Sequence, residues 1–171
     1  MAGAILVKKA RKPNPVVTQA DIDRANAGEA GAASYWTWSL CYGGRHQKRY
    51  AKQRPRPSQT TASEFLSALY AIQESMEDAE PTDADDFVSM RDAWAEEIRE
   101  LGDQQTEKFD NMPPGLQDGD TGQLLQERAD AMEQWAGEVE SVEVDTEDDS
   151  DTVENLITAA MDEIRGTDAG C

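Results

Sequence analysis

The apolar residues of this chain follow two different periods, one near its start and another over its remainder. Residues 34–42 are rich in tyrosine, tryptophan, threonine and leucine, a composition typical of a β-strand. The next two residues, Gly43-Gly44, can adopt the positive φ angles that a type I′ turn requires. A basic run then extends to Tyr50. We therefore predict a β-hairpin over residues 34–50.

Pairing about this turn determines the register and the faces of the hairpin. The predicted cross-strand pairs are Tyr42 with Arg45, Cys41 with His46, Leu40 with Gln47, and Trp38 with Arg49. Because side chains alternate along a strand, one face carries Trp36, Trp38, Leu40, Tyr42, Arg45, Gln47 and Arg49. Two strands alone are marginally stable, so we expect either a third strand from residues 4–8 or packing on the helix that follows.

The period changes to that of a helix after the hairpin. Prolines 55 and 57 predict an extended, polyproline-like link. The sequence TASE, from Thr61 to Glu64, then matches a capping box that opens a helix. The apolar residues of this helix are spaced by three or four and form one stripe: Phe65, Leu69, Ile72 and Met76.

Three further helices are predicted, from about Asp83 to Phe109, from near Thr121, and from about Thr152 to Ile164. The first has a heptad-like seam of Phe87, Met90 or Arg91, Trp94, Ile98 and Leu101, in which Gly102 is a soft spot. The second carries Leu125, Met132, Trp135, Val139 and Val142, and the third Val153, Leu156, Ile157, Met161 and Ile164. A Pro- and Gly-rich connection at 111–122 lets the first two fold back as an antiparallel hairpin, with Trp94 and Trp135 facing the seam.

These elements define the predicted class and organisation. The class is α+β, mostly α-helical, with a helical hairpin or small bundle and a small N-terminal β-hairpin or three-stranded sheet. A short helical turn from Thr18 or Asp21 is weakly indicated. We divide the chain into a basic, flexible lead-in (1–33), a hairpin and helix with a basic arm (34–80), an antiparallel helical hairpin (81–142), and an acidic linker with a C-terminal helix (143–171).

The charge is divided by position as well. The whole chain has a net charge of −19, with 35 acidic and 16 basic residues. Residues 1–57 nevertheless hold eleven basic and three acidic residues, a net of +8, which leaves −27 for the remainder. Such asymmetry suggests a basic arm that meets a polyanion. No apolar run approaches the length of a membrane span, and the start lacks the order of a signal peptide, so we expect a cytoplasmic protein without a membrane partner.

Candidate catalytic chemistry is sparse. The only histidine, His46, is predicted to lie opposite Cys41, which suggests a thiol–imidazole pair. No orienting group or oxyanion-hole motif accompanies the pair, and two ligands are too few for a structural zinc site. The acidic runs at 83–86 and 145–151 lack the frame of a calcium loop. We therefore expect no enzymatic activity, no catalytic residue, no metal site and no cofactor.

The basic segment carries the best candidate site. Its cations have no acidic neighbours within the segment, and arginine and lysine bind phosphates by displacing condensed counterions. A two-stranded ribbon also fits the major groove, and exposed aromatic rings can stack unpaired bases. For the tryptophans we favour a buried face against the Phe65 helix over base stacking. The candidate nucleic-acid-binding residues are Arg45, Lys48, Arg49, Lys52, Arg54 and Arg56.

The stretch YWTWSLCYGGRHQKRY, followed by a helix, resembles the arm-type DNA-binding domains of tyrosine integrases and, more loosely, AP2-type sheets, over about residues 34–75. The resemblance implies a sheet that contacts DNA. The resemblance does not extend to the recombinase itself. The Arg/His/Tyr constellation of such an enzyme cannot form here, because the one histidine lies in the hairpin. The layout also resembles small proteins of tailed viruses, with KKARK at the start, PSQ..SEFL at a helix entry and NMP..LQ...TGQLLQER at a connection.

The function we expect is that of a non-enzymatic viral or mobile-element accessory protein. Its basic hairpin would bind nucleic-acid phosphates, of DNA in preference to RNA, and its acidic helices would bind a protein partner or self-associate. Two alternatives stay open. The chain can be an assembly module whose basic segment docks on an acidic protein surface, or an acidic mimic of DNA.

Overall fold

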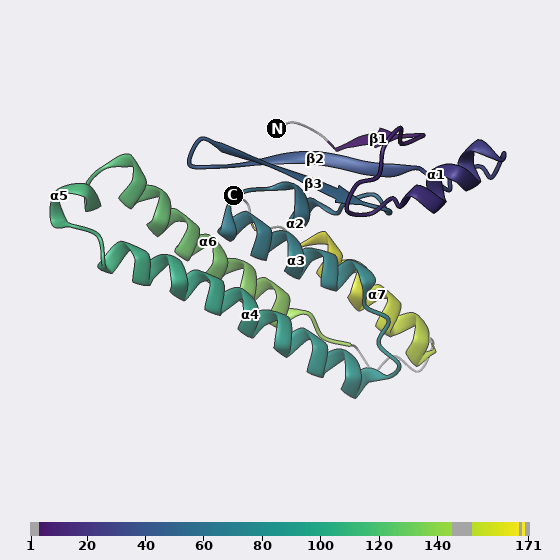
Figure 1. Cartoon of the computed structure of the whole chain (residues 1–171). Coiled ribbons are helices and arrows are strands. Elements are labelled where there is room, and N and C mark those ends of the chain that lie inside the picture. Colours follow the sequence, from purple (N-terminus) through teal and green to yellow (C-terminus); the bar gives the residue numbers. More distant parts are fainter. Residues whose placement is uncertain (1–3, 145–151, 168, 170–171) are drawn as a thin grey trace. The chain divides into compact units, whose positions relative to one another are not determined.

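The computed structural model describes residues 4–144, 152–167 and 169. The chain separates into two compact units, Met1–Tyr70 and Ala71–Cys171, called here the N-terminal and C-terminal units. A three-stranded sheet lies in the first and long helices dominate the second (Figure 1). This confirms the predicted class, α+β and mostly helical. The predicted acidic linker falls largely on residues outside the described part of the chain.

The sheet follows from the sequence pattern. It consists of β1 (Ile5–Val7), β2 (Tyr35–Tyr42) and β3 (Arg45–Ala51), antiparallel in the order β1-β2-β3. All four predicted pairs of the hairpin are confirmed. Gly43 and Gly44 have φ angles of +54° and +81°, which the two central positions of a type I′ turn require. Of the two predicted ways of stabilising the hairpin, a third strand from residues 4–8 is confirmed.

A small core links the sheet to the segment between β1 and β2. Within that segment α1 (Gln19–Asn26) begins after Thr18, whose side chain accepts a hydrogen bond from the Asp21 amide in a capping box. Of the two predicted starts, Thr18 is therefore the N-cap. The core residues are Ala10, Val17, Ile22 and Ala33, with Tyr35 packed against them. Residues 1–33, predicted to be a loose lead-in, thus contain a strand and a capped helix.

The segment between β3 and the long helices differs in part from the prediction. Arg56 has the extended backbone predicted for the link, with φ −78° and ψ +162°. Pro57 then opens a single helical turn, α2 (Pro57–Thr60), because the fixed φ of proline suits the first helical position. The next helix, α3 (Glu64–Asp78), starts later than its predicted cap at Thr61. Ser63 Oγ accepts from the Leu66 amide at 3.3 Å, while Thr61 Oγ1 accepts from the Ser63 amide. The predicted stripe is buried: Phe65, Leu69, Ile72 and Met76.

The C-terminal unit is built on the predicted helical hairpin. Figure 1 shows α4 (Ala84–Asp110) and α6 (Asp120–Ser141) side by side and antiparallel, with the unpredicted short α5 (Pro114–Gln117) in their connection. The last helix, α7 (Val153–Gly166), packs against α4. The predicted seams of the three long helices are buried at Phe87, Trp94, Ile98, Leu101, Leu125, Met132, Trp135, Val139, Val142, Ile157, Met161 and Ile164.

Two residues of these helices have roles that differ from those predicted from the sequence. Gly102 is buried at the close approach of α4 to α6, where an added Cβ would lie 3.0 Å from Met132 Cβ. It is therefore a packing position and not a soft spot. Val153, assigned to the apolar face of α7, is 53% exposed. Its position one residue after the N-cap Thr152 places it at the end of the helix.

Candidate nucleic-acid interface

Strand alternation divides the predicted cations between the two faces of the sheet. The tryptophan face carries Trp36, Trp38, Leu40 and Tyr42 of β2 with Arg45, Gln47 and Arg49 of β3. The tyrosine face carries Tyr35, Thr37, Ser39 and Cys41 with His46, Lys48 and Tyr50. Arg45, Lys48 and Arg49 are all exposed. Because they point to opposite faces, they do not form one continuous patch.

The tryptophan face is partly covered from within the N-terminal unit. Trp38 is half-buried, and its indole Nε1 donates to the carbonyl oxygen of Gln59 in α2 at 2.8 Å. The guanidinium of Arg54 lies over the ring of Trp36, 5.8 Å from its centroid. Leu40, two residues after Trp38 on the same face, is buried. These contacts give the tryptophans a structural role, through α2 and Arg54.

The three candidate residues beyond β3 have contacts inside the unit. Lys52 Nζ donates to the carbonyl oxygen of Ala32 at 2.9 Å and lies 3.9 Å from a carboxylate oxygen of Asp21. Arg54 stacks on Trp36, and the backbone amide of Arg56 donates to Gln59 Oε1 at the start of α2. Lys52 therefore anchors the end of β3 to α1, a role that the sequence did not indicate.

Asp21 is the acceptor at the centre of this anchor. Its carboxylate accepts from the Thr18 amide at 2.8 Å, from Thr18 Oγ1 at 2.9 Å and from an Arg24 nitrogen at 2.5 Å. The Thr18 amide and Arg24, with a smaller attraction from Lys52, hold the pKa of Asp21 far below its ordinary value of 3.8. Folding therefore favours the ionised form of this carboxyl.

This shift predicts a pH dependence of stability. Because the pKa is lower in the folded state, the contribution of Asp21 is present above 3.8 and is lost as the pH falls below it. Asp21→Asn should lower the thermal midpoint of the N-terminal unit at pH 7, and its difference from wild type should shrink below pH 3.8. Scanning calorimetry of both proteins from neutral to acid pH measures this. A difference that stays constant with pH would contradict it.

The tyrosine face bears a concave, basic site. A hollow of about 450 Å³ is lined by the segment after β1 and by two of the sheet's tyrosines, Tyr35 and Tyr50. Lys48 Nζ lies 5.5 Å from the Tyr50 ring centroid, and the rings of Tyr35 and Tyr50 are 5.9 Å apart. Its polar and aromatic lining is Lys9, Arg11, Lys12, Asn14, Tyr35, Lys48 and Tyr50. Of the predicted site residues, only Lys48 lies here.

Asn14 gives one wall of this hollow a defined turn. Its Oδ1 accepts from the amides of Val16 and Val17 at 2.9 and 3.0 Å, the pattern of an Asx turn. Its Nδ2 is buried with no hydrogen-bond partner among the described residues. Buried donors usually have a partner, so this amide is an unused donor beside the basic side chains.

Other chemistry is limited in the described residues. Cys41 and His46 are cross-strand neighbours as predicted, and both are exposed. Within residues 4–144, 152–167 and 169, no three His, Cys, Asp or Glu side chains gather as metal ligands would. Over the same ranges, none of the helices combines the length and the apolar character needed to cross a bilayer.

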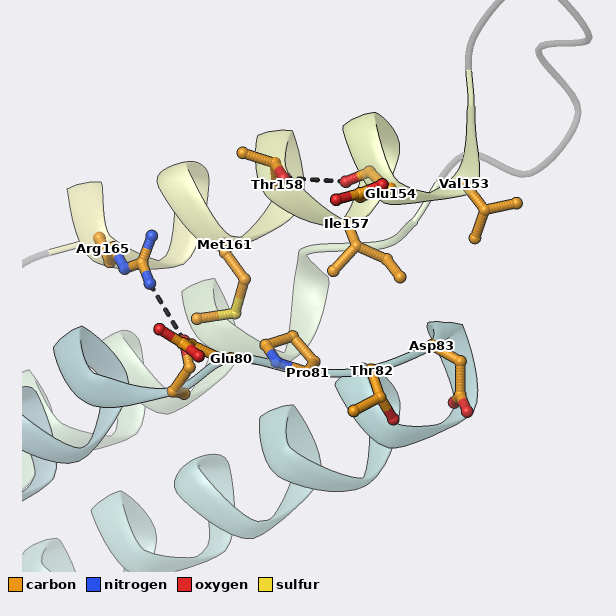
Figure 2. Close-up of a pocket in the computed structure, with 11 residues that line it drawn as sticks. Glu80, Pro81, Thr82, Asp83, Val153, Glu154, Ile157, Thr158, Met161 and Arg165 are labelled. Carbon is orange, nitrogen blue, oxygen red and sulfur yellow. Dashed lines mark hydrogen bonds between the residues drawn. The ribbon is translucent and has the colours of Figure 1, made fainter.

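A second hollow lies in the C-terminal unit. Figure 2 shows it between α7 and the connection from α3 to α4, with Pro81, Ile157 and Met161 as apolar lining. Its volume is about 620 Å³. Arg165 closes one end by donating to the carbonyl oxygen of Ala79 at 3.2 Å. The carboxylates of Glu80, Asp83 and Glu154 also line it, so it does not suit a polyanion.

Comparison of the chain with models of protein families, with curated proteins and with solved structures gives no match. The resemblance of residues 34–75 to arm-type DNA-binding domains therefore stays a prediction.

Proposed function

We propose that the N-terminal unit is a non-enzymatic module that binds nucleic-acid phosphates through its sheet. One observation carries the proposal: β1, β2, β3 and the segment 8–17 contain no acidic residue. The unit as a whole holds eleven basic and four acidic residues, a net of +7. Three of the four acids lie on α1 or just after it, and Asp21 is already engaged by Arg24 and Lys52.

The exposed cations of β3 are available to an external anion. Arg45, Lys48 and Arg49 form no ion pair with any described residue, and the guanidinium of Arg49 donates to Gln47 Oε1 at 3.1 Å. Each cation that neutralises a phosphate releases condensed counterions, so such contacts contribute most at low salt. A surface without carboxylates avoids the repulsion that acidic neighbours would add.

The C-terminal unit has the opposite charge, with 31 acidic and five basic residues, a net of −26. Such a surface repels a polyanion and attracts basic proteins. We propose that it binds a protein partner or a second copy of the chain, while the N-terminal unit engages nucleic acid.

Neutralising the sheet tests the first proposal. For three to five phosphate contacts, the log–log slope of affinity against salt should be roughly −3 to −4.5 on duplex DNA, at about −0.9 per contact. The triple variant Arg45→Gln, Lys48→Gln and Arg49→Gln should lose roughly 0.9 of that slope for each of the three cations that contacts a phosphate, and most of its low-salt affinity. Fluorescence anisotropy of labelled duplex and single strands measures both.

A matched control separates the effect of removing the sheet's cations from the effect of changing the net charge. Gln104→Glu, Gln123→Glu and Gln126→Glu add the same negative charge at exposed positions of α4 and α6. This control should keep the slope of wild type. If wild type retains neither single-stranded nor duplex DNA or RNA at low salt, the proposal is wrong and the assembly-module hypothesis takes its place.

A further inference from the structure

We propose that the hollow on the tyrosine face holds one unpaired nucleotide, so that the N-terminal unit prefers single-stranded nucleic acid to duplex. The inference rests on the proposed function and names the form of its ligand. It also moves the principal contacts to residues outside the predicted basic segment, namely Lys9, Arg11 and Lys12.

The first support is the convergence of cations from separate parts of the sequence. Arg11 and Lys12 follow β1, whereas Lys48 lies in the middle of β3, and folding brings them to the same hollow. Among the described residues, these three side chains form no hydrogen bond or ion pair. Lys9 makes one long contact, from Nζ to the Ala25 carbonyl oxygen at 3.5 Å. No carboxylate lines the hollow.

The second support is the shape of the site. A volume of about 450 Å³ lies within the roughly 300–1,000 Å³ typical of sites for small organic ligands. In a duplex the bases are stacked inside the helix, so only the backbone can reach a hollow of this size. A single strand can turn a base out of its stack and place it, with its phosphate, into a concave basic site.

The third support is the chemistry of the walls. Tyr35 and Tyr50 are half-buried on the sheet and present aromatic surface beside the cations. Base–aromatic stacking in such a setting tolerates any base. Asn14 adds the unused Nδ2 donor, which a phosphate or base oxygen can satisfy after a small shift of its turn. On the tryptophan face, by contrast, the indole of Trp38 already donates to Gln59 of α2, and Arg54 already lies over the ring of Trp36.

The test compares the two faces at equal charge in the full-length protein. The tyrosine-face variant is Lys12→Glu with Lys48→Glu, and the tryptophan-face variant is Arg45→Glu with Arg49→Glu. The ligands are a labelled 12-nucleotide oligothymidine and a 12-base-pair mixed duplex. Wild type should bind the single strand more tightly. The tyrosine-face variant should lose at least about tenfold in affinity and about 1.4 in salt slope, at about 0.7 per contact. The tryptophan-face variant should lose markedly less.

A stacking variant adds a measurement independent of charge. Tyr50→Leu should weaken binding of the single strand by about fivefold or more, as expected for one lost base stack, and Tyr50→Phe should retain it. Circular dichroism and the unchanged duplex affinity of the two Tyr50 variants verify that the sheet is intact.

The outcomes separate this inference from the proposed function. Tighter binding of duplex by wild type, or a larger loss in the tryptophan-face variant, would overturn the inference while leaving nucleic-acid binding in place. Failure of wild type to bind either ligand at low salt would instead overturn the proposed function.

Discussion

Replacement of Trp135 by alanine should lower the free energy of unfolding of the C-terminal unit by about 3–5 kcal/mol, as large-to-small substitutions of buried tryptophan do. Trp135 lies on α6 with 1% of its surface exposed, the largest of the fully buried side chains. Its indole Nε1 donates to Thr167 Oγ1 at 2.9 Å, just after α7. The substitution therefore opens a cavity and removes the hydrogen bond that links the two helices. Urea denaturation followed by circular dichroism at 222 nm measures the loss.

Two variants separate the contributions of volume and hydrogen bonding. Trp135→Phe keeps an aromatic ring in the core and should cost markedly less than alanine. Thr167→Val leaves the indole nitrogen buried without an acceptor, which should cost about 1–3 kcal/mol. If Trp135→Ala cost less than about 1 kcal/mol, the side chain would not be a core residue in solution and the arrangement of α6 and α7 would be wrong.

The hairpin is the part of the fold that local sequence determines most fully. Gly43-Gly44 sets the turn, and the turn alone sets every pair from Tyr42–Arg45 to Trp36–Ala51. The helices were predicted nearly as well, because apolar residues at spacings of three and four define a face whatever that face contacts. Their ends were harder to predict, since TASE contains two hydroxyl residues able to cap and the structure uses Ser63.

The candidate site could be predicted only in part. The alternation of side chains along β3 was evident from the sequence, and it already places Lys48 on the opposite face of the sheet from Arg45 and Arg49. The path of residues 9–14 was not, because it depends on burial of Ala10 and Val17 with Ile22 and on the turn at Asn14. The KKARK stretch was a visible signal of positive charge. Its placement beside Tyr35 and Tyr50 required the third strand to bring it there.

Gly102 shows the same limit of prediction from local sequence. Because glycine lowers helix stability, the sequence predicts a weak point in the helix at Gly102. In the structure it lets α4 approach Met132 of α6. The difference arises because propensity is a local quantity, whereas close approach depends on a residue 30 positions away in the chain.

Gly122→Ala should destabilise the C-terminal unit by about 3 kcal/mol or more, at or beyond the upper end of the usual cost of overpacking. Gly122 is buried in the first turn of α6, where an added Cβ would overlap the carbonyl oxygen of Gln117 and lie 2.7 Å from its carbonyl carbon. Gln117 cannot move away freely, because its side-chain amide donates to the carbonyl oxygens of Phe109 and Met112 at 3.1 and 3.2 Å. Relief would require shifting α5 or the first turn of α6.

Gly137→Ala provides the matched control in the same helix. Gly137 is an exposed position of α6, four residues before its last residue Ser141, and an added Cβ there meets no atom within 4 Å. Alanine at this position should stabilise the unit by about 0.5–1 kcal/mol, through helix propensity alone. The two glycine variants should thus shift the urea midpoint in opposite directions. A Gly122→Ala protein as stable as wild type would show that the turn from α5 into α6 has a different backbone path in solution, since no rotation of a methyl group can relieve a clash with main-chain atoms.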